Sequence, residues 1–185
     1  MSLKRVDTGA SKPSESPQAI VVMGVAGCGK SSVACLIAKR FGGVLIEGDS
    51  FHSQECIQKM RDGIPLTDID RAAWLAQLNE ALLRAVAADE LPVLACSALK
   101  ARYRDILGTG LSSLATVFLR LPRSIAESRV SLRADHYMPV SLVRNQFADL
   151  EPPRSGGNVI SIDATLPLQE ILTQLESWWR SRSTL

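Results

Sequence analysis

The sequence has little of what a protein that binds long polymers or membranes normally carries. Its 21 Lys and Arg residues are nearly balanced by 19 Asp and Glu residues, so the net charge at pH 7 is only +2. Proteins that bind nucleic acid or an anionic membrane surface over an extended face usually have a clear basic excess. Aromatic residues make up only 5% of the chain, which leaves few rings on which bases could stack. We therefore expect neither nucleic acid nor a membrane as a partner.

Long apolar runs and an export signal are also absent from the sequence. No run approaches the roughly 20 apolar residues that a membrane-spanning helix needs. Residues 1–17 are polar and lack the apolar stretch of a signal peptide, so we interpret them as a flexible tail. The four cysteines form no Cys-x-x-Cys pair, and we expect them to stay reduced in the cytoplasm.

Apolar patterning predicts strands that alternate with helices. Five short apolar runs rich in β-branched residues span 19–23, 43–46, 92–96, 115–119 and 159–162. Runs of this kind are typical of parallel strands that are buried on both faces. Apolar residues recur at helical spacing over 31–41, 68–88 and 168–179, and Thr67 with Asp70 resembles a capping box at the start of the second helix. This order predicts an α/β fold with a five-stranded parallel sheet flanked by helices, in a single domain over 18–185.

A phosphate-binding motif follows the first predicted strand. The segment Gly24-Val25-Ala26-Gly27-Cys28-Gly29-Lys30-Ser31 fits the P-loop pattern G-x-x-x-x-G-K-[ST] and lies between a strand and a helix, as this motif requires. Backbone N–H groups from Gly24 to Ser32 would surround the phosphates, Lys30 would reach the β- and γ-phosphates, and Ser31 would bind Mg²⁺. No Asn-Lys-x-Asp motif of the kind that selects guanine is present, which favours ATP over GTP.

Cys28 occupies a P-loop position where Ser or Thr is common. One interpretation is a small residue that the loop tolerates. The other is a thiol whose pKa is lowered by the helix N-terminus and by Lys30, which would make it sensitive to oxidation.

Two carboxylates lie at the end of the second predicted strand. Glu47 and Asp49 are separated by one residue, so we expect their side chains to point the same way. A hydroxyl that accepts a phosphoryl group needs a nearby base or hydrogen-bond acceptor. We assign Asp49 to that role and Glu47 to the binding of Mg²⁺. The alternative is an acidic turn exposed to solvent.

Longer motifs resemble those of the gluconokinase family. Besides the P-loop, they comprise Glu47-Gly48-Asp49-x-x-His52, the run from Lys59 to Leu75, the run from Cys96 to Asp105, and the runs 129–139 and 146–152. The resemblance covers roughly residues 19–175. It implies a three-layer P-loop kinase fold, akin to shikimate kinase and adenylate kinase. It also implies ATP-dependent phosphorylation of D-gluconate at its 6-hydroxyl.

The resemblance further suggests roles for residues outside the P-loop. Groups suited to the carboxylate and hydroxyls of gluconate are His52, Lys100, Arg104 and His136. The Arg-rich segment over about 123–152 is either a helix face exposed to solvent or, as in a small kinase, a mobile helical lid. In a lid, Arg129 and Arg133, which lie one helical turn apart, would neutralise charge on the transferring phosphoryl group. A homodimer is also implied.

Two other functions are compatible with these residues. One is a kinase of the same fold that acts on shikimate or a nucleoside monophosphate. The other is a non-catalytic ATP-binding module, which would need neither the acceptor-side carboxylates nor the lid arginines. Cys56 stands where the family pattern has Asn, so acceptor preference is the property that this departure would affect.

Overall fold

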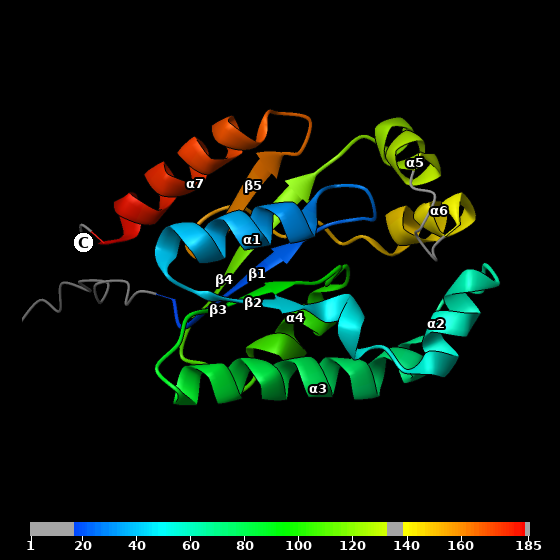
Figure 1. Ribbon diagram of the computed structural model, residues 1–185, viewed down its shortest axis with the longest axis horizontal. Coiled ribbons are helices and arrows are strands. Elements are labelled where there is room, and N and C mark those ends of the chain that lie inside the picture. The colour runs from blue at the N-terminus through cyan, green and yellow to red at the C-terminus, as the bar shows by residue number, and fades with distance from the viewer. Residues whose placement is uncertain (1–16, 133–138, 184–185) are drawn as a thin grey trace, which may run out of the picture.

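The computed structural model describes residues 17–132 and 139–183, and its centre is a parallel sheet. The sheet order is β2-β3-β1-β4-β5, and every pairing is parallel (Figure 1). The strands are β1 (Ala19–Met23), β2 (Val44–Glu47), β3 (Pro92–Ala95), β4 (Leu114–Arg120) and β5 (Val159–Asp163). The predicted five-stranded parallel sheet is therefore confirmed. No strand end differs from its predicted position by more than one residue.

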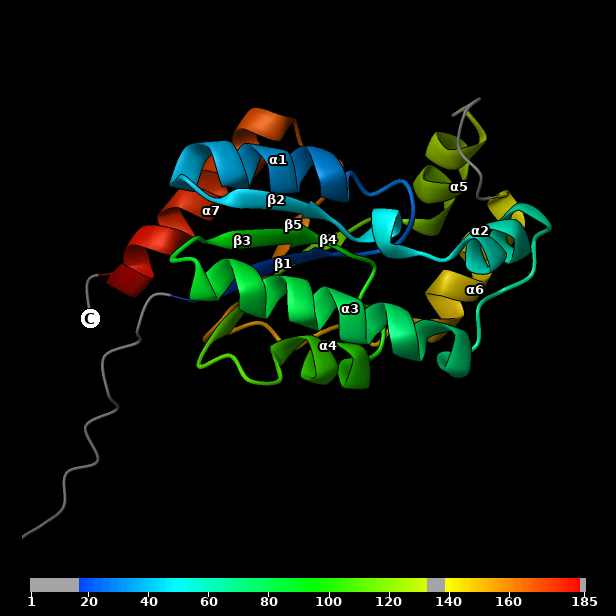
Figure 2. The ribbon, with the colours of Figure 1, turned by 60° about the horizontal axis from the view of Figure 1, so that its bottom comes forward.

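Helices cover both faces of the sheet. One face carries α1 (Lys30–Phe41) and α7 (Leu168–Ser183), and the other carries α3 (Asp68–Ala87) and α4 (Ala101–Gly108) (Figures 1 and 2). In β1, Ile20 and Val22 belong to the core under α1, whereas Val21 and Met23 belong to the core against α3. Both sets of side chains are buried, which explains why this strand is apolar at every position instead of alternating.

Further helices lie beyond the carboxyl ends of the strands (Figures 1 and 2). They are the short 3₁₀ helix η1 (Gly48–Phe51), α2 (Gln54–Arg61), α5 (Arg123–Ser131) and α6 (Val140–Asp149). A small apolar cluster of Cys56, Met60, Leu66 and Leu142 packs α2 against α6. Ligands of open parallel sheets bind at this edge, so these helices surround the expected site. The predicted lid over 123–152 contains α5 and α6, and its mobility stays a prediction.

Helix ends follow local sequence signals. Helix α1 begins after Gly29 (φ 90°) and ends at Gly42 (φ 70°), two positions whose left-handed backbone favours glycine. The capping box at α3 is confirmed: Asp70 N donates to Thr67 Oγ1 at 3.2 Å, and Thr67 N donates to Asp70 Oδ2 at 2.8 Å. Helices α2 and α4 were not predicted, because eight residues are too few for a clear helical period.

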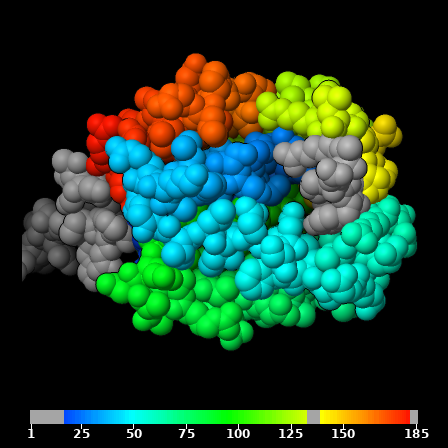
Figure 3. Space-filling view, viewed as in Figure 1, coloured from blue at the N-terminus to red at the C-terminus, as the bar shows by residue number. Residues whose placement is uncertain are grey.

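Residues 1–16 of the predicted tail lie outside the described residues, and Pro17 is buried. On the face shown in Figure 3, the surfaces of α1, of β2 with η1, and of α3 form adjacent bands. None of the helices in the described ranges is long and apolar enough to cross a membrane.

Candidate active site

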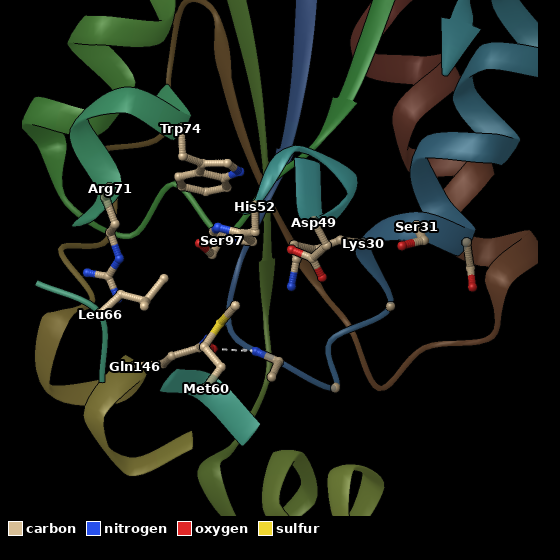
Figure 4. Close-up of a pocket in the computed structure, with 14 residues that line it drawn as sticks. Lys30, Ser31, Asp49, His52, Met60, Leu66, Arg71, Trp74, Ser97 and Gln146 are labelled. Carbon is tan, nitrogen blue, oxygen red and sulfur yellow. Dashed lines mark hydrogen bonds between the residues drawn. The ribbon is translucent and has the colours of Figure 1, made fainter. Parts of the chain in front are cut away.

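A pocket at the carboxyl edge of the sheet brings together the P-loop, η1, α3 and α6 (Figure 4). Its lining residues are Ala26, Gly27, Gly29, Lys30, Ser31, Ser32, Asp49, His52, Met60, Leu66, Arg71, Trp74, Ser97 and Gln146. In the close-up, Arg71 and Trp74 lie on one side, Ser31 lies on the other, and Asp49 lies between them. Of the predicted residues outside the P-loop, Asp49 and His52 line this pocket together with Lys30 and Ser31 of the loop.

The P-loop has the backbone conformation that its glycines permit. Gly24, Gly27 and Gly29 have φ values of 143°, 82° and 90°. A Cβ on Gly24 would lie 2.8 Å from both Leu119 O and Cys28 Sγ, so no larger residue fits there. Lys30 Nζ donates to Val25 O at 3.2 Å, which places the ammonium group across the loop. A glycine-rich loop that lines the pocket before a helix, together with an ammonium group, suits a polyphosphate.

An oxygen pair lies next to the P-loop. Ser31 Oγ donates to Glu47 Oε2 at 3.0 Å, so the end of β2 and the start of α1 present a hydroxyl and a carboxylate together. Mg²⁺ prefers such hard oxygen ligands and is commonly held by one or two protein groups together with substrate phosphates and waters. These two residues therefore fit the predicted metal site.

Asp49 is positioned by the packing of η1 against α3. Trp74 Nε1 donates to Gly48 O at 2.8 Å, and the His52 ring stacks on Trp74 with centroids 4.4 Å apart. A Cβ on Gly48 would lie 2.7 Å from Ala95 O, so η1 approaches β3 at a distance that only glycine allows. This packing holds Asp49 at the pocket wall, in the place expected for the acceptor-side carboxylate.

His52 is held in its neutral form by its surroundings. Burial lowers the pKa of His52, nearby Asp49 opposes that effect, and Arg71 adds to it. Among the described residues, no hydrogen-bond partner reaches the buried Nδ1 of His52. His52 also lines the pocket, where a neutral imidazole can bind a ligand hydroxyl.

Arg71 is a pocket residue to which the sequence analysis assigned no role. It lines the acceptor side from α3, and its side chain is 13% exposed. Arg71 Nη1 donates to Tyr103 Oη at 3.0 Å and pairs with Asp149 Oδ2 at 3.3 Å. A signal was present in the sequence: Arg71 lies one turn before Trp74, which the helical pattern places on the buried face of α3.

Gln146 is a second pocket residue without a predicted role. Its Oε1 accepts a hydrogen bond of 2.6 Å from Ala26 N, so a side chain of α6 contacts the P-loop backbone (Figure 4). The two residues are 120 positions apart, and no local pattern could have linked them.

Two predicted substrate residues do not line the pocket. Lys100 pairs with Asp68 at 3.4 Å and with Asp149 at 3.3 Å and lines a neighbouring groove. Arg104 donates to the carbonyl oxygens of Ala98 and Leu99, both at 3.0 Å. Ala98 has a φ of 43°, so Arg104 supports an unusual turn after β3.

Arg129 joins the P-loop to the loop after β5. Its guanidinium donates to Gly27 O at 3.2 Å and, through both terminal nitrogens, to Ala164 O at 3.1 Å. This position beside the P-loop agrees with a role near the phosphates. Arg133 and His136, the other lid residues with predicted roles, lie outside the described residues.

The prediction that the pKa of Cys28 is lowered is wrong. The thiol is 2% exposed, and burial raises its pKa more than neighbouring Lys30 lowers it. A thiol that stays protonated is a poor nucleophile, so Cys28 acts as a small packing residue against Gly24.

The fold and the site together define a small P-loop kinase. A P-loop with its lysine, an adjacent hydroxyl–carboxylate pair and a further carboxylate in the same pocket are the kinds of groups that phosphoryl transfer to a hydroxyl uses. The particular kinase family follows from comparison with known proteins.

The chain belongs to the gluconokinase family. It is 41% identical to a probable gluconokinase of Mus musculus over 172 residues, which cover 83% of this chain and 94% of that protein. A gluconokinase structure from Sinorhizobium meliloti 1021 superposes with a TM-score of 0.79 at 43% identity, covering 90% of this chain and 94% of that one. A sugar kinase structure from Janibacter sp. HTCC2649 gives a TM-score of 0.82 at 38% identity, with 88% and 94% covered. No protein-family model matches the chain.

Proposed function

We propose that this chain transfers the γ-phosphoryl group of ATP to the 6-hydroxyl of D-gluconate and releases ADP and 6-phospho-D-gluconate. The observation that carries the proposal is the single pocket in which Lys30 and Ser31 of the P-loop face Asp49, with Arg71 on the far side. Relatives named gluconokinases that match over most of their length support gluconate as the acceptor.

The nucleotide half consists of the P-loop and its neighbours. The amides of residues 24–32 and the Lys30 ammonium would hold the phosphates, and Ser31 with Glu47 would hold Mg²⁺. When bound, Mg²⁺ neutralises charge on the phosphate oxygens. Arg129 keeps the P-loop in place through Gly27.

Asp49 performs the acid–base step on the acceptor side. It accepts a hydrogen bond from the 6-hydroxyl and takes its proton as that oxygen bonds to the γ-phosphorus. The bond between the γ-phosphorus and the β,γ-bridging oxygen breaks, and ADP leaves with that electron pair. The proton then passes to solvent.

Arg71 provides the cation for the carboxylate end of gluconate. A planar guanidinium can bind a carboxylate with two parallel hydrogen bonds, and Arg71 reaches the pocket where Lys100 and Arg104 do not. Neutral His52 binds a hydroxyl of gluconate that lies between its carboxylate and its 6-hydroxyl. The predicted role of His136 remains open to test by substitution.

An acceptor panel tests this function. Purified protein is assayed for ADP release with Mg-ATP and either D-gluconate, shikimate or AMP. We expect D-gluconate to give a kcat/KM at least about a hundredfold above the others. A preference for shikimate or AMP would support a same-fold kinase of another acceptor. Nucleotide binding without acceptor-dependent ADP release would support the non-catalytic module.

The variant Asp49→Asn separates catalysis from binding in the same assay. We expect kcat to fall by about 10²–10⁴-fold, because proton transfer by a positioned side chain contributes on that order. ATP affinity should stay within about threefold, because Asp49 lies on the acceptor side.

We also propose a single-domain, cytoplasmic homodimer. The common sheet that organises all described elements supports one domain. Light scattering after size exclusion tests the dimer, and a mass of one 20.0 kDa chain would contradict it.

A further inference from the structure

Helix α6 contacts both halves of the pocket through two residues that lie three positions apart. Gln146 Oε1 accepts from Ala26 N of the P-loop at 2.6 Å. Asp149 Oδ2 pairs with Arg71 on the acceptor side at 3.3 Å. Residues three apart lie on one face of a helix, so α6 is a physical link between the phosphate site and the carboxylate site.

Each of these two contacts occupies a protein group that we assign to a substrate: the Ala26 amide to the nucleotide phosphates, and the Arg71 guanidinium to the acceptor carboxylate. Ala26 N belongs to the loop whose amides bind phosphate, and Ala26 and Gln146 line the same pocket as Lys30 and Asp49. A phosphate oxygen is charged and accepts a hydrogen bond more strongly than a neutral carboxamide does. A bound triphosphate can therefore displace Gln146 from Ala26 N. On the other side, Asp149 occupies the guanidinium that we assign to the acceptor carboxylate.

Neighbouring groups allow Asp149 and Arg71 to separate at a small cost in free energy. Lys100 Nζ also lies 3.3 Å from Asp149, at Oδ1, so the carboxylate keeps a cation when Arg71 turns away. Arg71 likewise keeps Tyr103 as a hydrogen-bond partner. A small shift of α6 thus leaves no buried charge unpaired, which would otherwise be costly.

We propose that Gln146 is a positioning residue that makes acceptor binding depend on the nucleotide. Phosphate binding at the P-loop releases Gln146, α6 shifts, and Arg71 exchanges Asp149 for the carboxylate of the acceptor. This inference rests on the proposed function, since it requires a carboxylate acceptor that binds at Arg71.

Calorimetric titration of D-gluconate into the full-length protein tests the inference. Titrations are run without nucleotide and with saturating Mg²⁺ and a non-hydrolysable ATP analogue. For the wild-type chain we expect gluconate to bind at least about fivefold more tightly with the analogue, which is the lower end of typical coupling between sites. In Gln146→Ala, the ratio of the two affinities should fall to within twofold of unity. In Asp149→Asn, gluconate should bind more tightly without nucleotide, and the ratio should again fall.

Asn145→Ala is the matched control. Asn145 is an exposed amide on the same helix and next to Gln146, and it lines the neighbouring groove with Lys100. This variant should keep the wild-type ratio. A wild-type ratio near unity, or a wild-type ratio in Gln146→Ala, would overturn the inference.

A second variant covers the case in which Gln146→Ala does not fold. Gln146→Glu keeps an acceptor for Ala26 N but places a negative charge at the phosphate site. We expect nucleotide affinity to fall at least tenfold while gluconate affinity without nucleotide stays within twofold. Unchanged nucleotide affinity would overturn the inference. A wild-type chain that neither binds nor phosphorylates gluconate would refute the proposed function, and with it this inference. An active wild-type chain with unaltered coupling in Gln146→Ala would refute the inference alone.

Discussion

Ser31 Oγ donates a hydrogen bond of 3.0 Å to Glu47 Oε2, and this contact joins the start of α1 to the end of β2. The two residues are 16 positions apart, yet the parallel order of the sheet brings them to the same edge. The contact orients the hydroxyl toward the carboxylate. Substitution of either residue should therefore change the Mg²⁺ concentration that the enzyme needs more than it changes the KM for ATP or gluconate.

Glu47→Gln should raise the Mg²⁺ concentration needed for half-maximal activity by about tenfold, because groups that orient a metal ligand typically contribute 10–100-fold. Activity is measured against free Mg²⁺ at saturating ATP and gluconate. Glu90→Gln, at an exposed turn before β3, is the control and should match the wild type. An unchanged Mg²⁺ dependence in Glu47→Gln would exclude Glu47 from the metal site.

Arg71→Met should raise the KM for gluconate by roughly 10- to 150-fold, because a hydrogen bond to a charged group contributes about 1.5–3 kcal/mol. The KM for ATP should stay within threefold. Arg71→Lys should recover only part of the loss, since an ammonium group cannot make the paired hydrogen bonds of a guanidinium. Arg84→Met, on the exposed side of α3, controls for general effects on that helix. Equal effects on both substrates would contradict a carboxylate role for Arg71.

Arg129→Ala should weaken ATP binding by about tenfold and leave gluconate binding nearly unchanged. The reason is that the guanidinium joins Gly27 of the P-loop to Ala164 after β5, on the nucleotide side alone. Fluorescent-nucleotide titration measures the change. Arg123→Ala is the control, because Arg123 on the same helix pairs with Glu127 at the surface. A larger loss of gluconate affinity than of ATP affinity would argue against this assignment.

His52 should make the folded protein less stable in mild acid. Burial lowers the pKa of His52 in the folded state, so between about 6.5 and the lower folded value the unfolded chain binds a proton that the folded protein does not. The stability linked to His52 is therefore present above about pH 6.5 and is lost as the pH falls through the folded pKa. The Tm of the wild type should fall more steeply between pH 7.5 and 5 than that of His52→Asn. Parallel Tm curves would show that His52 is not buried in this way.

Local patterns predicted the five-stranded parallel sheet well, and with it the edge at which the strand ends meet. The P-loop, Glu47 and Asp49 each stand directly after an apolar strand, and the parallel topology determines where strand ends meet. The acceptor half was predicted less completely. Arg71 and Gln146 acquire their roles from partners on distant elements, and Ala26 is 120 residues from Gln146.

The charged residues of the acceptor side show why sequence alone was insufficient there. Lys100 and Arg104 have suitable chemistry and follow β3, but Asp149 and two backbone carbonyls hold them away from the pocket. Which cation reaches a ligand depends on these competing contacts, and spacing along the chain does not encode them. The role of Arg133 at the phosphates stays a prediction.

The most direct test of the central claim is the ³¹P NMR spectrum of the product formed from ATP and D-gluconate. Phosphorylation at the 6-hydroxyl places the phosphorus next to a CH₂ group, so its proton-coupled signal should be a triplet that appears together with stoichiometric ADP. A doublet from an ester at a secondary hydroxyl would contradict the proposed orientation of gluconate between Asp49 and Arg71. Inorganic phosphate as the sole new phosphorus product besides ADP would contradict transfer to gluconate altogether.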